Sequence, residues 1–337
     1  MSSPTPPGGR ARRPPPVVLD PAARRLVDAS AAPPHLHDIG PVDGRLALRA
    51  AQDHAGDGPD VRTEFRAAPV GPSGLVGFQL VRPAAATGPL PAVLYLHGGR
   101  WTLGDAGTHR LLTGALAERA GAALLVPEYS RAPEARYPVA VEECYALLEW
   151  AAANAAGLGL RGDRLAVAGD CAGATMAAAL ALLAARRGGP RPRAQLLYYP
   201  MTDPGCGSAS QRRFATGYPL TRRALHRYWR EYCPDERRLA EPAAAPLRAT
   251  AADLAGLPPA LVVSAEADVA RDEAEEYARR LRAAGVAVTC VRYLGAVHDF
   301  ASLTALRDSP PARAAVRQGA AFLAAALHGG EEPGTPT

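Results

Sequence analysis

The sequence LAVAGDCAGA occupies residues 165–174 and changes character at its centre. Leu165 to Ala168 form a compact apolar run typical of a buried strand, and the small residues after Cys171 are typical of a helix. Gly169 and Gly173 stand two residues before and after Cys171, which permits a turn too sharp for side chains at either position. The stretch therefore predicts a strand, a tight turn and a helix, with Cys171 projecting from the turn.

The place of Cys171 at the start of a helix bears on its chemistry. A helix N-terminus carries partial positive charge, which favours the thiolate, the reactive form of cysteine. Two glycines that flank a nucleophile in this way form the pattern G-x-nucleophile-x-G. A small buried cysteine on an ordinary strand–helix turn gives the same letters, so other parts of the sequence have to separate the two interpretations.

Strands and helices are expected to alternate on both sides of this stretch. Short apolar runs predict strands at 92–96, 122–126, 165–168, 195–199, 260–264 and 286–293, after a strand-like zone at 61–82. Helical spacing predicts helices at 108–119, 138–153, 172–187, 272–284 and 312–327. Such alternation is typical of an α/β fold with a mostly parallel sheet.

The expected core is interrupted once and extended at both ends. Its two parts are 59–204 and 249–328, and the Arg- and Tyr-rich stretch 205–248 between them breaks the alternation like a helical insertion. Residues 18–58 predict one or two short amphipathic helices. Residues 1–17 and 329–337 are rich in Pro and Gly and are expected to be disordered tails.

Composition argues against several classes of protein. The 337 residues carry a formal net charge of +5, but no basic run alternates with aromatics, which argues against nucleic-acid binding. No apolar run is long enough to span a bilayer or to resemble a secretion signal, so we expect a cytoplasmic protein without a membrane partner. The five cysteines include no CxxC pair, so we expect no disulfide framework, no metal and no cofactor.

Three further motifs carry groups of catalytic type. Residues 94–101, LYLHGGRW, place consecutive glycines after a strand, where backbone N–H groups can hold an oxyanion. Asp268 follows the strand at 260–264, and His298 follows the strand at 286–293. Cysteine, acid and histidine thus occur in this order, each at the carboxyl end of a strand, the edge of a parallel sheet where ligands bind.

These motifs resemble those of the hormone-sensitive-lipase family of bacterial and plant carboxylesterases, over roughly 18–328. HGGRW at 97–101 is similar to the family's oxyanion motif of HGG, a small residue and an aromatic, and GDCAG at 169–173 is similar to its GDSAG. YSRAPE at 129–134 resembles its YRLAPE segment. DVARDE at 268–273 and HDF at 298–300 resemble its D-P-L-R-D-E and HGF segments.

The resemblance implies an α/β-hydrolase fold with an eight-stranded, mostly parallel sheet, flanking helices and a helical cap made by 18–58 and 205–248. It implies a catalytic triad of Cys171, Asp268 and His298. It implies an oxyanion hole made by the N–H groups of Gly98, Gly99 and Ala172. The candidates for lining the substrate pocket are Arg100, Trp101 and Asp170.

The chain also departs from the family pattern. Cys171 replaces the usual serine, Arg100 replaces a small residue, and Asp299 replaces the glycine of HGF. An arginine in the oxyanion loop carries a fixed charge and a fork suited to carboxylate or phosphate. We therefore expect Arg100 to face the pocket and favour an anionic substrate. The alternative is that its side chain turns out to solvent or pairs with a carboxylate such as Asp105.

The residues and the resemblance together predict attack by Cys171 on an ester, lactone or thioester carbonyl through an acyl-thioester, followed by hydrolysis or acyl transfer, in specialised metabolism. The expected partner is a small-molecule acyl substrate, free or bound to a carrier or coenzyme A, and a homodimer is compatible with the sequence. Two alternatives stay open. One is elimination, as in a plant branch of the family, and the other is non-catalytic binding, as in the plant gibberellin receptors, which lack the histidine that stands here at His298.

Overall fold

The computed structural model describes residues 16–53 and 58–329. The expected tails at 1–17 and 329–337 fall almost entirely outside the described residues, as do 54–57 in the expected N-terminal helical segment. The prediction of disordered tails is therefore not tested.

The core is a single sheet of eight strands in the order β1-β2-β4-β3-β5-β6-β7-β8. The strands are β1 (Val61–Ala68), β2 (Val76–Pro83), β3 (Leu90–Leu96), β4 (Ala123–Pro127), β5 (Leu160–Asp170), β6 (Gln195–Tyr198), β7 (Ala260–Ala267) and β8 (Val288–Val297). β2 pairs antiparallel with β1 and β4, and the pairs from β4 to β8 are parallel. The predicted mostly parallel, eight-stranded α/β sheet is confirmed.

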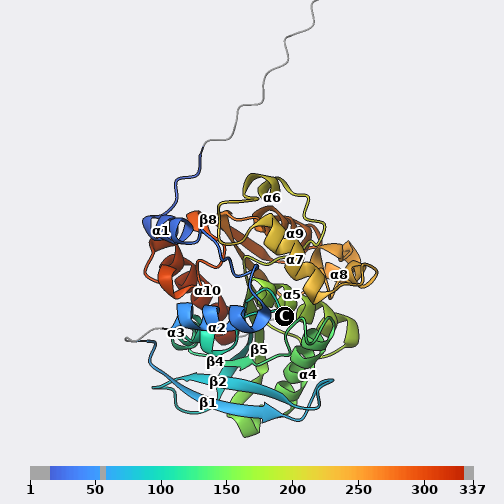
Figure 1. Cartoon of the computed structure of the whole chain (residues 1–337). Coiled ribbons are helices and arrows are strands. Elements are labelled where there is room, and N and C mark those ends of the chain that lie inside the picture. The colour runs from blue at the N-terminus through green and yellow to red at the C-terminus, as the bar shows by residue number, and fades with distance from the viewer. Residues whose placement is uncertain (1–15, 54–57, 330–337) are drawn as a thin grey trace, which may run out of the picture.

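Helices cover both faces of this sheet (Figure 1). They are α3 (Arg110–Ala120), α4 (Val139–Ala153), α5 (Ala172–Arg187), α8 (Ala251–Leu254), α9 (Arg271–Ala283) and α10 (Pro310–His328). α3 packs against α10 on one side of the sheet, and α4, α5, α8 and α9 form a chain of contacts on the other. Strands β3, β4 and β6 are almost entirely buried, as expected for parallel strands between two helical layers.

The register of the parallel strands brings the motifs together. Leu96 at the end of β3 pairs with Gly169 of β5. The loop that follows β3, residues 97–101, therefore lies beside the turn at Cys171, and we call it the glycine loop. Ala267 of β7 pairs with Val297 of β8, so Asp268 and His298 leave the sheet side by side. β8 runs four residues beyond its predicted end at Tyr293, and this extension carries the chain directly to His298.

The remaining helices lie over the carboxyl ends of the strands (Figure 1). They are α1 (Pro21–Ala29) and α2 (Pro41–Gln52) from the N-terminal segment, and α6 (Ala209–Arg213) and α7 (Arg222–Tyr232) from the insertion. Arg227 of α7 donates a hydrogen bond to the carbonyl of His37, just before α2. The two segments expected to form a cap are therefore in contact, and we treat them together as the cap.

Local sequence explains where these helices begin. Prolines occupy the first turns of α1 and α2, where a missing N–H costs nothing, and the Asp20 side chain accepts a hydrogen bond from Ala22 N at 2.8 Å. Thr221 caps α7 by accepting from Ala224 N.

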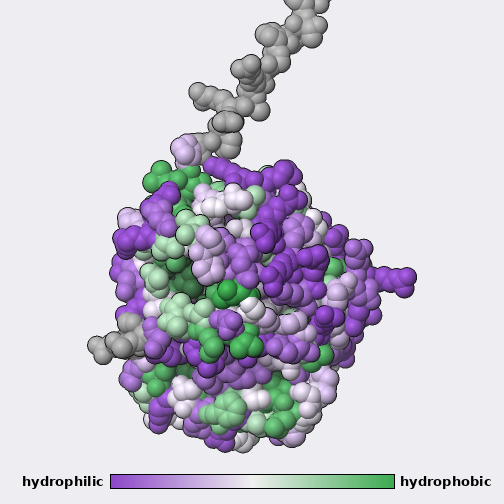
Figure 2. Space-filling model, in the orientation of Figure 1, coloured by the Kyte–Doolittle hydropathy of each residue, from purple (hydrophilic) through white to green (hydrophobic). Residues whose placement is uncertain are grey.

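The outer surface over the cap is mixed. Figure 2 shows apolar residues gathered over α2, where the side chains of Val42 and Leu46 are exposed. Among the described residues, no helix has both the length and the apolar character required to cross a membrane.

Candidate active site

The turn that carries Cys171 has the shape that its glycines predict. β5 ends at Asp170, α5 begins at Ala172, and Cys171 between them has φ 52° and ψ −123°. A Cβ on Gly173 would lie 1.9 Å from the carbonyl oxygen of Leu96, and one on Gly169 would lie 2.5 Å from the backbone of Gly173. Only glycine fits at either position, because the start of α5 touches the end of β3.

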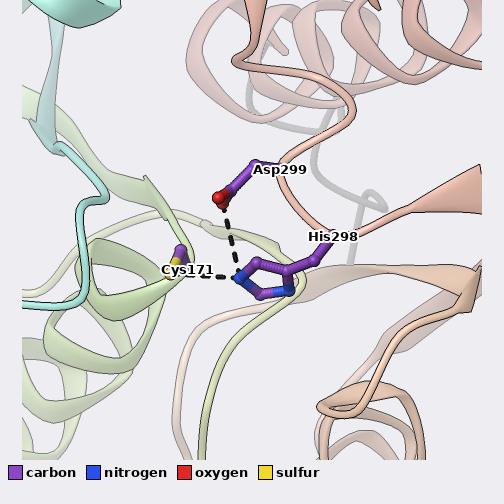
Figure 3. A group of neighbouring side chains, drawn as sticks. All are labelled: Cys171, His298 and Asp299. Carbon is purple, nitrogen blue, oxygen red and sulfur yellow. Dashed lines mark hydrogen bonds and ion pairs between the residues drawn. The ribbon is translucent and has the colours of Figure 1, made fainter. Parts of the chain in front are cut away.

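Three predicted residues from three separate strand ends form a continuous chain of contacts. The Sγ atom of Cys171 lies 3.1 Å from Nε2 of His298, and Nδ1 of His298 lies 2.7 Å from Oδ2 of Asp268. Figure 3 shows the His298 ring, after β8, pointing at Cys171 in the turn before α5. Because a carboxylate only accepts hydrogen bonds, Nδ1 carries a proton and Nε2 faces the sulfur.

The surroundings of His298 stabilise its charged form. Burial lowers the pKa of His298, but Asp268, Asp299 and Cys171 together raise it well above its ordinary value. All three groups lie within the buried site, so their charges act on the ring with little screening by water. The imidazole is therefore well suited to take and hold a proton.

The glycine loop supplies N–H groups next to the sulfur, but not all those predicted. Gly98 N donates to Oδ1 of Asp170 at 2.9 Å, so it is already used, and the structure does not support Gly98 as an oxyanion donor. The N–H groups of Gly99, Arg100 and Ala172 have no acceptor within 16–53 and 58–329. These three groups are the remaining candidates for an oxyanion hole.

Asp170 holds the glycine loop in place through hydrogen bonds and is buried rather than exposed in a pocket. Its carboxylate is fully buried and accepts hydrogen bonds from the Tyr95 hydroxyl at 2.8 Å and from Gly98 N, and it lies 3.3 Å from Nε2 of His109. Burial opposes the negative charge, but His109 and the hydrogen bonds lower the pKa of Asp170. A Cβ on Gly98 would lie 2.4 Å from this carboxylate, so its position also explains why residue 98 is glycine.

Arg100 and Asp299, two of the departures from the family pattern, contact each other. The Nη2 atom of Arg100 lies 2.9 Å from Oδ2 of Asp299, and both side chains are largely buried. Asp299 also places Oδ1 3.4 Å from Nε2 of His298. The expected alternative partner of Arg100, Asp105, instead binds Arg49.

Trp101 forms part of an aromatic cluster between the glycine loop and the cap. Its ring stacks on Tyr232 of α7 with centroids 4.2 Å apart and lies 4.5 Å from Trp229. Tyr228 of the same helix lies beside the guanidinium of Arg100, 5.8 Å from ring centroid to Cζ. The two indole N–H groups and the hydroxyls of Tyr228 and Tyr232 have no hydrogen-bond partner within the described part of the chain.

Cys171 projects from the turn as predicted, but into the interior of the protein. The residue is 0% exposed, and His298 is only 2% exposed. Cys290 on β8 is exposed, whereas Cys144, Cys206 and Cys233 are buried, and all five thiols are free.

Two features of the site were not found from the sequence. His109 was assigned no role, although it pairs with Asp170, and Asp299 was noted only as a departure. The partners lie 61 and 199 residues apart along the chain, so no local pattern signals them. The one available signal was that Arg100 and Asp299 are opposite charges at two positions where the family carries small residues.

Known hydrolases resemble this chain in sequence and in fold. A family profile described as the alpha/beta hydrolase fold matches residues 93–302. A carboxylic ester hydrolase of Mycobacterium tuberculosis, LipN, is 38% identical over 270 residues, which cover 78% of this chain and 70% of that protein. A thermostable esterase from Pseudomonas putida has a similar structure, with TM-score 0.90, 39% identity and coverage of 94% of this chain and 99% of its own. Carboxyl esterase 2 of the fungus Tuber melanosporum has TM-score 0.84 and 33% identity, and covers 92% of this chain and 100% of its own.

Proposed function

The chain belongs to the α/β-hydrolase fold family, in its hormone-sensitive-lipase branch, and from that membership we propose that it hydrolyses carboxylic esters with Cys171 as the nucleophile. The observation that carries the proposal is the chain of contacts from Sγ of Cys171 through His298 to Asp268, at 3.1 Å and 2.7 Å. The esterases among its relatives support the reaction class. The cysteine is the feature that sets this chain apart from the family's GDSAG motif.

Acylation begins with a proton transfer across the short contact. Nε2 of His298 takes the thiol proton, and Asp268 holds the ring in position and stabilises the imidazolium. The sulfur attacks the substrate carbonyl, and the oxyanion accepts hydrogen bonds from the N–H groups of Gly99, Arg100 and Ala172. When the intermediate collapses, the alcohol leaves with the proton from Nε2, and the acyl group stays on Cys171 as a thioester.

Release of the acyl group reuses the same histidine. His298 removes a proton from water, the hydroxide attacks the thioester, and the carboxylic acid leaves as the sulfur is regenerated. Thioesters also react readily with amines and thiols, so the same intermediate permits acyl transfer when such a nucleophile enters in place of water. The retained histidine and acid favour covalent catalysis over non-catalytic binding.

The surroundings of Cys171 bear on the choice of substrate. The guanidinium of Arg100 is already paired with Asp299, so an anionic substrate has to compete with that carboxylate. The unpartnered N–H and O–H groups of Trp101, Tyr228 and Trp229 can donate to a substrate that carries oxygen acceptors. These features favour a polar ester that is uncharged near the scissile bond.

The test is the kinetics of variants at position 171 on p-nitrophenyl esters. Cys171→Ala is expected to lower kcat/KM by at least about 10³-fold, since it removes the nucleophile. Cys171→Ser is expected to restore the rate only in part, because this site holds a charged imidazole next to a large, acidic atom. Cys290→Ser, which alters the exposed thiol on β8, is the matched control and should keep the wild-type rate. A Cys171→Ala variant with wild-type turnover would exclude covalent catalysis at this residue.

A further inference from the structure

We propose that Cys171, His298 and Asp299 form a binding site for a zinc-type divalent cation, in which Asp299 supplies the ligand that the family's HGF motif, with glycine at this position, lacks. The binding itself does not depend on the reaction proposed above. Its consequence, reversible inhibition of ester hydrolysis, does.

The three candidate ligand atoms lie close together on one side of the site. Sγ of Cys171, Nε2 of His298 and a carboxylate oxygen of Asp299 are all within 4.8 Å of one another. Figure 3 shows the cysteine and the aspartate converging on the same ring nitrogen. Zinc binds sulfur at about 2.3 Å and nitrogen or oxygen at about 2.0–2.2 Å, so atoms at this spacing can share one ion after small side-chain rotations.

Two of the three candidate ligands, His298 and Asp299, are each held by a neighbouring charged side chain, as ligands in metal sites usually are. Asp268 holds Nδ1 of His298 at 2.7 Å, which fixes the tautomer whose Nε2 can bind a metal. Arg100 holds Oδ2 of Asp299 at 2.9 Å, which leaves Oδ1 directed at Nε2. A carboxylate–histidine pair and a hydrogen-bonded carboxylate are the usual second layer of a zinc site.

The charge of the buried site favours a divalent cation. Metal binding requires an ionised thiol and an Nε2 atom of His298 without its proton. In that state Cys171, Asp268 and Asp299 carry three negative charges, and Arg100 carries one positive charge. All four side chains are largely buried, so the net charge of −2 that results from these groups needs compensation. A divalent cation supplies that compensation as the thiol proton passes to solvent.

Metal binding at these atoms blocks the proposed reaction directly. The same Sγ and Nε2 atoms would attack the carbonyl and move the proton, so a bound cation removes both from use. Three protein ligands leave a fourth position open on zinc for water or a small anion. The predicted result is a thiol-dependent hydrolase that zinc inhibits and a chelator reactivates.

The first measurement is direct binding, with cobalt(II) as a spectroscopic probe for zinc. Chelator-treated wild-type protein is titrated with cobalt(II), and a thiolate-to-cobalt charge-transfer band is expected to saturate at one equivalent and to disappear when zinc is added. Cys171→Ala should abolish the band. Cys290→Ser, which removes the exposed thiol, is the control and should retain it.

The decisive variant is Asp299→Gly. Asp299 has φ +63°, which suits glycine, so this substitution is expected to fold, and thermal unfolding verifies that it does. We expect its affinity for zinc, measured by competition with cobalt, to fall at least about tenfold. The zinc concentration that half-inhibits hydrolysis should rise by the same factor.

Two results would overturn the site. One is retention of the charge-transfer band in Cys171→Ala, and the other is equal zinc affinity in wild type and a folded Asp299→Gly protein. If wild type binds cobalt as expected but hydrolyses no ester, the proposed function fails and the metal site stands. If wild type hydrolyses esters but binds no cobalt, the metal site fails and the proposed function stands.

Discussion

Three residues account for what is distinctive about this site. Cys171 stands where the family motif has serine, and Arg100 and Asp299 stand where it has small residues. Folding brings all three to one place, because Asp299 contacts both Arg100 and Nε2 of His298, which in turn contacts Cys171. The two charged substitutions offset each other, which explains how a buried arginine is tolerated next to Cys171.

A neighbouring histidine gives a residue-scale prediction about pH. His97 is fully buried against Tyr129, and burial together with the nearby His109 lowers its pKa to about 3. The folded state keeps His97 neutral, whereas the unfolded chain protonates it near its ordinary pKa of about 6.5. Below its ordinary pKa, His97 therefore binds a proton in the unfolded state but not in the folded state. The contribution of His97 to stability is complete above the unfolded pKa and is lost as pH falls toward the folded pKa.

Urea unfolding of wild type and His97→Gln between about pH 6.5 and pH 5 measures this effect. The wild-type free energy of unfolding should fall more steeply with decreasing pH, by up to about 1.4 kcal/mol per pH unit, which is the linkage slope for one proton. The variant lacks the titrating ring and should lose that part of the slope. Parallel slopes in the two proteins would show that His97 is not held neutral.

At the scale of elements, the site depends on how closely α5 approaches β3. The register of β3 with β5 sets the glycine loop beside the turn, and the start of α5 touches the carbonyl of Leu96. The sequence pattern located this turn correctly, because glycine spacing reports a steric requirement that is local. The four extra residues of β8, 294–297, are apolar and three of them are buried, but they were not predicted because Gly295, with φ 71°, is typical of a break in a strand.

The close contact between α5 and β3 predicts that adding one methyl group at residue 173 lowers the stability of the protein. In Gly173→Ala the new Cβ would lie 1.9 Å from the carbonyl oxygen of Leu96, so the helix and the strand have to separate. Alanine normally stabilises a helix relative to glycine. Here we expect the opposite, a loss of at least about 3 kcal/mol in the free energy of unfolding.

Chemical denaturation with Gly157→Ala as the matched control checks this expectation. A Cβ on Gly157 meets no atom within 4 Å, so that substitution should change stability little. Similar stabilities for the two variants would mean that the close contact between α5 and β3 is not required.

At the scale of the whole molecule, the sequence predicted the architecture and the contact between Cys171, Asp268 and His298, but not the enclosure of the site. Alternating strands and helices, with Cys171, Asp268 and His298 each after a strand, were enough to place these residues at one edge of the sheet. The burial of Cys171 depends on residues far from it in the chain, such as Met201 and His298, whose contacts with the sulfur no periodic pattern in the sequence indicates. The pairs Asp170–His109 and Arg100–Asp299 escaped prediction for the same reason.

The enclosed site also has a functional consequence. For the proposed thioester on Cys171, enclosure away from water would delay hydrolysis until an acceptor enters. Val42 and Leu46 of α2, which belong to the cap, are exposed.

The proposed mechanism requires that Cys171 is acylated during turnover, and intact mass spectrometry detects the acyl group. Wild-type protein is mixed with p-nitrophenyl acetate and quenched in acid within the first turnovers. The intact mass of the protein is measured, and the protein is then digested to locate the modified peptide. We expect one acetyl group per chain, located on the peptide that contains Cys171, released by neutral hydroxylamine as a thioester is, and missing from Cys171→Ala. Steady hydrolysis with the acetyl group on another residue, or with none on the protein, would contradict the account.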